Sequence, residues 1–348
     1  MINDLFREDL KSFKPYEVDK NNYTIRLDAN ESFLNFPEEL KEELMNSIGN
    51  IFFNRYPDSD STEICKLYAD YAGIDFKSVM AGNGSDELIQ IIVNAIIKVG
   101  DKAMMLTPDF SVYNIYTKLV GGIPVEFQLN DSFELDVESL IAKANFEGVK
   151  LIFISNPNNP TGGVIPEEHL IKIIKETKSI IVIDEAYYEF YGETLVDEIN
   201  TYENLVILRT CSKALGLAAL RLGFLITNNL LMSEFKKVKL TYNVNTITQS
   251  IAAVVLKRPE LIKKNIEFIL KEREYLLNEI KKIQGITVYP TKANYVLIES
   301  SFKDELRKKT LECGISVRNF SSPRLKNCLR ITVGNRKENK AFIDSISR

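Results

Sequence analysis

The chain is poor in the residues that bind zinc and form disulfides. It has four cysteines and one histidine among 348 residues, and no tryptophan. The cysteines, Cys65, Cys211, Cys313 and Cys328, lie far apart, none has C-x-x-C spacing, and the histidine is His169. This pattern argues against a metal site and predicts free thiols.

The chain also lacks an excess of charge of either sign and any long apolar run. Its 44 basic and 48 acidic side chains leave a net charge of −4, so no general field attracts nucleic acid or an anionic membrane. Anion recognition must therefore come from a few placed arginines. Residues 1–18 contain no apolar stretch of signal-peptide length, and no segment approaches membrane-spanning length. We expect a cytoplasmic protein that binds neither nucleic acid nor membrane.

From Ser78 onward, short apolar runs rich in β-branched residues alternate with amphipathic stretches. The chain is 45% hydrophobic, which allows a large core, and its length indicates about two domains. Near-continuous apolar strands alternating with helices are typical of a mostly parallel sheet covered on both faces, so we predict an α/β fold. The predicted strands are 101–106, 123–127, 149–155, 179–185, 204–210 and 221–227, and the clearest helices are 85–99 and 166–177.

Changes in the pattern of apolar and charged residues along the chain predict three parts. Residues 1–36 form an irregular arm, residues 37–240 a large domain, and residues 241–348 a smaller α+β domain. Residues 250–283 are charged and helically periodic, and we interpret them as one connecting helix with a solvated face; a coiled coil and a membrane-surface helix are the alternatives. The small domain is predicted to contain strands 294–300 and 328–334, helix 304–314 and a last helix.

Several polar segments follow predicted strands, which is where open parallel sheets place ligand sites. Residues 81–87, A-G-N-G-S-D-E, open a helix. Ser85 can cap that helix, and its free N–H groups can bind an anion, although many helices begin in this way for capping alone. Residues 155–163, S-N-P-N-N-P-T-G-G, are either a rigid turn or a display of two side-chain amides toward a ligand oxygen.

Two further segments carry charge. Residues 181–188, I-V-I-D-E-A-Y-Y, end an apolar strand with two acids, which need a positive partner if they are buried. Asp184 is therefore either an exposed strand-end carboxylate or one that faces a ring cation, with the Tyr187 hydroxyl beside it. The segment T-C-S-K, followed by seven residues and R-L-G, makes Lys213 either a surface charge or an amine nucleophile beside phosphate donors such as Arg221.

Taken together and in this order, N-P-x-N-P-T-G, D-E-A-Y and S-K-x7-R-x-G resemble the fold-type I aminotransferases, which use pyridoxal phosphate (PLP). Asn159 precedes Asp184 by 25 residues, and Asp184 precedes Lys213 by 29. The resemblance covers nearly the whole chain and implies a large PLP-binding domain with a smaller C-terminal one. Within this family, N-R-Y-P-D, T-C-S-K-A-L-G-L-A-A-L-R-L-G-F, A-N-Y and L-R-I-T-V-G are similar to the histidinol-phosphate aminotransferases.

The resemblance implies a role for each matching residue. Lys213 would hold the cofactor as a Schiff base and later move the substrate's α-proton, and Asp184 would pair with the ring nitrogen. Asn159 and Tyr187 would hydrogen-bond the ring hydroxyl. Phe110 stands where the family usually has a tyrosine against the ring. The cofactor phosphate would be held by Gly84, Ser85, Asp86, Thr210, Ser212 and Arg221, and by Tyr56 of the partner subunit in a homodimer.

The resemblance also implies the substrates. An amino group would move between L-histidinol phosphate, a phosphorylated amino alcohol, and 2-oxoglutarate, giving imidazole acetol phosphate and glutamate in histidine biosynthesis. Arg330 would bind the carboxylate of glutamate, Arg318 the substrate phosphate, and Tyr16 would close over the substrate; arginine suits both oxyanions. The alternatives are a threonine-phosphate decarboxylase, an aromatic amino acid aminotransferase and a non-catalytic PLP-binding regulator. A regulator would carry an added DNA-binding domain, for which the residues before the fold leave no room.

Overall fold

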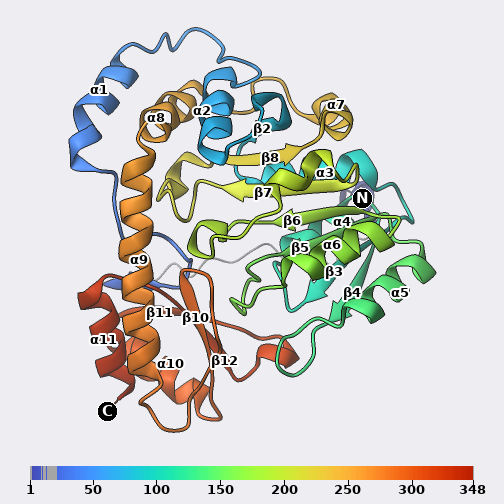
Figure 1. Ribbon diagram of the computed structural model, residues 1–348. Coiled ribbons are helices and arrows are strands. Elements are labelled where there is room, and N and C mark those ends of the chain that lie inside the picture. Colours follow the sequence, from blue (N-terminus) through green and yellow to red (C-terminus); the bar gives the residue numbers. More distant parts are fainter. Residues whose placement is uncertain (1, 9, 11–12, 14–21, 348) are drawn as a thin grey trace.

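The larger of two sheets has seven strands, in the order β2-β8-β7-β6-β5-β3-β4. The computed structural model, shown in Figure 1, describes residues 2–8, 10, 13 and 22–347. Strands β4, β3, β5, β6 and β7 are parallel, whereas β8 is antiparallel to β7 and β2. The predicted α/β fold is confirmed. The bounds are β2 Val79–Gly82, β3 Lys102–Thr107, β4 Ile123–Gln128, β5 Leu151–Ser155, β6 Ile180–Asp184, β7 Leu205–Thr210 and β8 Gly223–Thr227.

Both faces of this sheet are buried, as the continuous apolar strands predict. Alternate residues of β5 enter different cores: Leu151 and Phe153 pack on the side of α3, α4 and α7, while Ile152 and Ile154 pack on the side of α2, α5 and α6. All four are fully buried. The covering helices are α2 Thr62–Ala72, α3 Ser85–Ile96, α4 Val112–Leu119, α5 Val137–Glu147, α6 Glu167–Glu176 and α7 Asn229–Val238.

The second sheet joins the two ends of the described chain. Its order is β1-β11-β12-β10-β9, and β1, from the predicted N-terminal arm, runs parallel to β11. The other pairs are antiparallel. The division of the chain into an arm and two domains stays a prediction. The bounds are β1 Ile25–Leu27, β9 Thr287–Val288, β10 Tyr295–Glu299, β11 Ile315–Asn319, β12 Cys328–Thr332, α10 Lys303–Glu312 and α11 Arg336–Ile346.

The single connecting helix predicted over 250–283 is wrong, because two helices occupy this stretch. Helix α8 spans Thr246–Leu256 and α9 spans Pro259–Ile280. Pro259 has no N–H to continue the ladder of α8, but it is well suited to the first position of a new helix. Helix α8 packs against α1 (Lys41–Gly49) and α2, and α9 reaches β10 and α11. Figure 1 shows α9 running along one side of the molecule from the large sheet to the small one.

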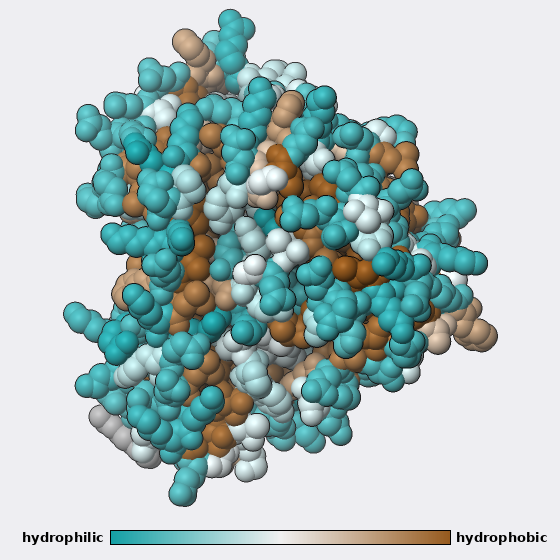
Figure 2. Space-filling view, in the orientation of Figure 1, coloured by the Kyte–Doolittle hydropathy of each residue, from teal (hydrophilic) through white to brown (hydrophobic). Residues whose placement is uncertain are grey.

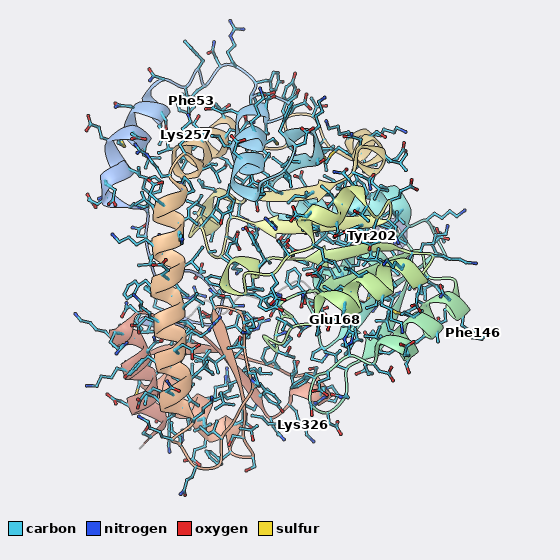
Figure 3. All side chains as sticks on the ribbon, in the orientation of Figure 1. Phe53, Phe146, Glu168, Tyr202, Lys257 and Lys326 are labelled. Carbon is cyan, nitrogen blue, oxygen red and sulfur yellow. The ribbon has the colours of Figure 1, made fainter. Side chains whose placement is uncertain are left out.

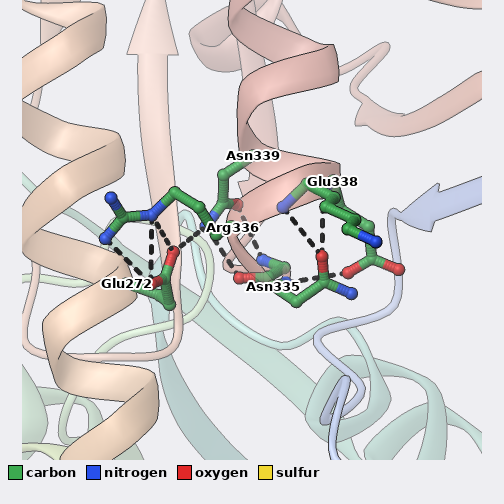
Figure 4. Close-up of polar contacts among 7 residues, drawn as sticks. Glu272, Asn335, Arg336, Glu338 and Asn339 are labelled. Carbon is green, nitrogen blue, oxygen red and sulfur yellow. Dashed lines mark hydrogen bonds and ion pairs between the residues drawn. The ribbon is translucent and has the colours of Figure 1, made fainter.

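A buried carboxylate fastens α11 to α9. Glu272, whose side chain is 4% exposed, accepts hydrogen bonds from Arg336 Nε and Nη2 at 3.0 Å each and from Asn339 Nδ2 at 3.2 Å. Helix α11 begins with a capping box between Asn335 and Glu338, which satisfies the N–H groups at its start. Figure 4 shows the two networks side by side. Together they fix the last helix against the long one.

The face of the molecule seen in Figure 2 is mostly polar. Figure 2 shows polar residues over most of one face, with apolar residues visible in bands between them. In the described part of the chain, no helix is both long and apolar enough to cross a membrane. All four cysteines are free thiols. The 3-10 helices are η1 Ile2–Leu5, η3 Glu38–Leu40, η4 Phe76–Ser78, η5 Tyr188–Phe190, η6 Val196–Asn200, η7 Ala218–Leu220 and η8 Pro323–Leu325.

Candidate active site

The carboxyl ends of β5, β6 and β7 meet at one edge of the large sheet. Ser155 is the register partner of Asp184, and Asp184 is the partner of Leu208. Because the strands are parallel neighbours, the loops that follow them open on the same side. This edge brings together the segments that contain Asn159, Asp184 and Lys213, as their places after predicted strands indicate.

Lys213 is half-buried, and its Nζ donates a hydrogen bond to the carbonyl of Ala29 at 2.9 Å. Burial, together with the positive charges of Arg330 and Arg221, lowers the pKa of this amine to about 8. A lysine with such a pKa has a neutral fraction of about a tenth at pH 7, far above that of an amine with the usual pKa, and the neutral amine is the nucleophilic form. Lys213 is therefore chemically distinct from an ordinary surface lysine.

We expect the attachment of a small aldehyde to Lys213 in the cofactor-free protein to speed up with pH and to level off above about pH 8. Only the neutral amine attacks, and its pKa is lowered from 10.5. Trapping with acetaldehyde and cyanoborohydride, read by peptide mass spectrometry, gives the rate at each pH. The exposed Lys340 serves as the internal control for the reactivity of the reagents at each pH. A midpoint for Lys213 near 10.5 would contradict this assignment.

The two acids of D-E-A-Y have different partners. Glu185 Oε2 accepts from Arg209 Nε at 2.9 Å, and both side chains are at most 3% exposed. The Arg209 guanidinium lies 3.5 Å from the centre of the Tyr188 ring. Glu185 thus has its cation within the chain, which accounts for its burial.

Asp184 is equally buried, but its hydrogen bonds come from neutral donors. Tyr113 donates its hydroxyl to Oδ2 at 2.7 Å, and the Ala186 N–H donates to Oδ1 at 3.0 Å. Burial raises the pKa of Asp184 to about 6, against the opposing effect of the bond from Tyr113. No cation forms an ion pair with Asp184 among the described residues, and such a carboxylate gains from a cationic ligand placed against it.

Arg330 of the small sheet reaches this edge, and Arg318 lies opposite it in register. Arg330 is 7% exposed; its Nη1 donates to Asn159 Oδ1 at 2.6 Å and its Nη2 to the Asp28 carbonyl at 2.8 Å. Arg318 on β11 is its register partner across the antiparallel pair. Directly opposed residues of antiparallel strands point to the same face. Both guanidinium groups are therefore on the same side of the small sheet, and Arg330 reaches the Asn159 loop.

Tyr187 and Asn30 form a buried pair. Asn30 Nδ2 donates to the Tyr187 hydroxyl at 2.9 Å, and the Tyr187 ring stands edge-on to Tyr295 with centroids 5.1 Å apart. Burial raises the pKa of Tyr187, with opposing effects from Arg330 and from the Asn30 bond. Tyr187 was identified from the sequence, but Asn30 was not.

The start of α3 forms a tight cradle with Arg221. Gly84, at φ +85°, precedes α3, and no side chain caps this helix. The expected capping by Ser85 is wrong, because Ser85 is the first residue of the helix rather than its N-cap. A Cβ on Gly84 would lie 2.8 Å from Arg221 Nη2, and one on Gly223 would lie 2.7 Å from the Ser85 nitrogen. Arg221 also donates to Ser212 Oγ at 3.2 Å and pairs with Asp86 at 3.4 Å.

These features suit a phosphate group. Uncapped N–H groups at a helix start attract anions, and Arg221 stands opposite them. Thr210 is buried one strand away, where its hydroxyl accepts from the Ser212 N–H at 3.1 Å. Backbone atoms of Gly84 and Ser85 approach residue 223 so closely that only glycine fits there, and the positive φ of residue 84 also favours glycine.

The remaining expected site residues lie in different surroundings. Phe110 is partly buried, and its ring stands edge-on to Tyr113 at 5.7 Å. Tyr56 is 81% exposed and stacks on Tyr242 at 4.6 Å. Tyr16 lies outside the described residues. Tyr113 is a site residue that sequence reasoning missed, because nothing in T-P-D-F-S-V-Y distinguishes it from a core aromatic.

The model of the family "aminotransferase class I and II" matches residues 24–346. The histidinol-phosphate aminotransferase of Clostridium novyi is 50% identical over 346 residues, which is 99% of this chain and 97% of that one. The Clostridium kluyveri enzyme of the same name is 48% identical and covers 100% and 99% of the two chains. The chain belongs to the histidinol-phosphate aminotransferases, within the class I and II family. The family that the sequence motifs indicate is thereby confirmed.

Solved structures agree on the fold. The Sinorhizobium meliloti histidinol-phosphate aminotransferase, in complex with pyridoxal-5'-phosphate, matches with a TM-score of 0.90 at 21% identity, over 99% of this chain and 97% of that one. The Clostridium acetobutylicum enzyme matches with a TM-score of 0.84 at 28% identity, over 93% and 98%. The site of this aminotransferase fits PLP: an amine with a lowered pKa, a buried carboxylate without an internal cation and a glycine-lined anion cradle correspond to the aldehyde, the ring nitrogen and the phosphate.

Proposed function

We propose that this aminotransferase moves an amino group between L-histidinol phosphate and 2-oxoglutarate, with PLP held at Lys213. Curated relatives of that name, up to 50% identical over 99% of the chain, support the proposal. The observation that carries the proposal is the register pairing of Arg318 with Arg330. It places a second guanidinium group, that of Arg318, beside the Arg330 group that is held by Asn159. Substrates that carry a phosphate or a second carboxylate need such a pair.

When bound, PLP supplies an electron sink next to the α-carbon of the substrate. Lys213 would hold the cofactor, and its amine, when free, would move the proton at the α-carbon of the substrate. Asp184 keeps the ring nitrogen protonated, which is also the cationic partner that its buried carboxylate lacks. Tyr187 and Asn159 bind the ring hydroxyl. Phe110 packs against the ring, and the phosphate is held by Gly84, Ser85, Asp86, Thr210, Ser212 and Arg221.

Arg330 and Arg318 divide the recognition of the two substrates. Arg330, fixed by Asn159 and by the Asp28 carbonyl, presents its guanidinium to the α-carboxylate of glutamate. Arg318, half-buried on the neighbouring strand, binds the phosphate of histidinol phosphate and, in turn, the second carboxylate of glutamate. A guanidinium suits both anions because its donors are planar and paired. One site can therefore accept two differently shaped substrates in alternation.

Replacing Arg318 by alanine should lower kcat/KM for histidinol phosphate by about 10- to 100-fold, the range for the loss of a charged hydrogen bond. Phenylalanine, which carries no phosphate, should lose far less. Steady-state kinetics with both donors measure the ratio. Arg318→Lys is the matched control, because it keeps the positive charge but not the paired donors. Its kcat/KM for histidinol phosphate should lie between those of wild type and Arg318→Ala. An equal loss on both donors would show that Arg318 does not recognise phosphate.

The reaction itself is tested by offering PLP-loaded enzyme a panel of donors with 2-oxoglutarate. The donors are histidinol phosphate, phenylalanine, tyrosine and threonine phosphate, and both glutamate and carbon dioxide are followed. We expect glutamate to form fastest from histidinol phosphate. A faster reaction with the aromatic amino acids would favour an aromatic aminotransferase. Carbon dioxide from threonine phosphate, without glutamate, would overturn aminotransfer.

We also propose that the enzyme is a homodimer in which Tyr56 reaches the phosphate in the partner's site. Tyr56 is 81% exposed, and its neighbours Phe52 and Phe53 are 78% and 73% exposed. Figure 3 shows Phe53 at the outer edge of the molecule, on the loop between α1 and α2. Contiguous exposed aromatic side chains mark an interaction surface. A second copy of the chain would cover them.

Subunit exchange between Lys213→Ala and Tyr56→Ala proteins tests this arrangement. We expect Tyr56→Ala alone to weaken PLP binding about 10- to 100-fold, through one lost bond to a charged phosphate. At limiting PLP the mixture should be more active than either variant, because a hybrid dimer restores one complete site. Mixing wild type with Lys213→Ala is the control for exchange. Activity no higher than that of Tyr56→Ala would contradict a contribution from the partner.

A further inference from the structure

Residues Asp28 to Asn30 contact three different site residues in succession. The Asp28 carbonyl accepts from Arg330 Nη2 at 2.8 Å, the Ala29 carbonyl accepts from Lys213 Nζ at 2.9 Å, and Asn30 Nδ2 donates to the Tyr187 hydroxyl at 2.9 Å. This segment follows β1 of the small sheet, whereas Lys213 and Tyr187 follow strands of the large one. It therefore joins both sheets at the site.

Asn30 is the rigid member of the segment. It is 1% exposed and has a left-handed backbone, with φ +55°, which asparagine tolerates better than most residues. Its N–H donates to Thr332 Oγ1 at 2.9 Å, and its carbonyl accepts from Asn294 Nδ2 at 3.1 Å. The backbone of Asn30 thus cannot turn without breaking bonds to β12 and to the residue before β10.

The orientation of the Asn30 amide is fixed as well. Its Oδ1 lies 3.3 Å from Thr332 Oγ1, which already accepts a bond from the Asn30 N–H and so turns its own proton toward Oδ1. This leaves the NH2 end facing Tyr187, and an NH2 group can only donate. The Asn30 amide can therefore only donate a hydrogen bond to Tyr187 and cannot accept one from it.

The hydrogen bond from Asn30 determines which hydrogen bonds the Tyr187 hydroxyl can still make. A phenol has one proton, and the donor from Asn30 occupies a lone pair of its oxygen. The proton must then point elsewhere, so Tyr187 faces the site as a donor. Its ring cannot swing freely, because Tyr295 stands edge-on to it and Tyr295 itself donates to the Asn158 carbonyl at 2.5 Å.

We propose that Asn30 is a positioning residue that fixes the Tyr187 phenol as a hydrogen-bond donor to the ring oxygen of the cofactor. This inference rests on the proposed function. A donor to that oxygen favours its anionic form, and the anion is fully exposed only after the proton at the Lys213 nitrogen has left. Asn30 thereby lowers the pKa of the Lys213 nitrogen in the PLP-loaded enzyme, through Tyr187 and without touching the cofactor.

The test is a spectrophotometric pH titration of the PLP-loaded enzyme with Asn30→Gly, Tyr187→Phe and the double variant. Glycine removes the amide, adds no charge and accepts the left-handed backbone. We expect Asn30→Gly to raise the pKa of the Lys213 nitrogen by about one unit, as for one lost hydrogen bond. In the Tyr187→Phe background the same substitution should cause no further shift. An equal shift in both backgrounds, or none in either, would overturn the inference.

A second variant keeps the test decisive if Asn30→Gly does not fold. Asn30→Asp preserves shape and backbone preference, and it puts an acceptor where the donor stood. The direct effect of its charge appears in both backgrounds and cancels in the difference between them, so the remaining shift measures coupling through Tyr187. Failure of the proposed function has a different signature: wild-type protein would show no titrating cofactor band and no attachment at Lys213.

Discussion

Lys213→Ala is expected to abolish amino transfer, with a loss on the order of 10⁴-fold or more, beyond what removal of a general base usually costs. The loss is larger because the same amine holds the cofactor in place and moves the α-proton. Single-turnover formation of glutamate from histidinol phosphate and 2-oxoglutarate, with PLP in excess, measures the effect.

The folded state should tolerate this substitution. Lys213 lies in the loop between β7 and η7, and the burial that lowers its pKa disfavours the charged amine. Far-UV circular dichroism of the cofactor-free protein should therefore match that of wild type, and its Tm should be no lower. Lys340→Ala, at an exposed position of α11, is the matched control and should keep full activity. Near-normal turnover by Lys213→Ala would remove the basis of the whole assignment.

Asp184→Asn should lower kcat by about 10²- to 10³-fold, which corresponds to removing one member of a buried charge pair. The amide keeps the shape of the side chain but carries no negative charge to hold the ring nitrogen protonated. Stability should change in the opposite direction. Burial raises the pKa of Asp184 from 3.8 to about 6, so the cofactor-free protein loses stability as the pH rises through this range, and the full loss remains above about pH 6. The cofactor-free variant should then have a higher Tm than wild type at pH 7 and above.

Tyr113→Phe separates charge from hydrogen bonding at Asp184. It removes the hydroxyl that donates to Asp184 at 2.7 Å but leaves the carboxylate, so we expect only about a tenfold loss in kcat. If Asp184→Asn lost no more activity than Tyr113→Phe, the carboxylate would not be acting through its charge. The two variants together decide between a residue that stabilises a cation and one that only packs beside it.

The sequence predicted those parts of the fold that depend on local pattern. Strands β5, β7 and β8 were found because each is an apolar run that is buried over its whole length. Strands β1, β2 and β9 are shorter, and their pairing depends on partners far away in the sequence, such as β1 with β11. The break at Pro259 could have been read from the sequence, since proline starts helices well but does not continue them.

The site residues likewise fall into those that the sequence pattern predicts and those that it does not. Asn159, Asp184 and Lys213 belong to dense motifs after strong strands, so their meeting at one sheet edge follows from topology. Asn30 and Tyr113 act through single contacts, 2.9 Å to Tyr187 and 2.7 Å to Asp184, which no spacing along the chain encodes. The roles of Arg318, Tyr16 and Tyr56 stay predictions, and Tyr16 lies outside the described residues.

The buried pair of Glu185 and Arg209 constrains how this sequence can change. Each side chain is at most 3% exposed. Replacing either residue alone therefore leaves the other charge buried without a partner, which lowers the free energy of unfolding by about 3–5 kcal/mol. Neutral drift at these two positions must therefore proceed by joint replacement or not at all. Among descendants of this chain we expect them to co-vary as a unit, although neither residue has a role in the chemistry.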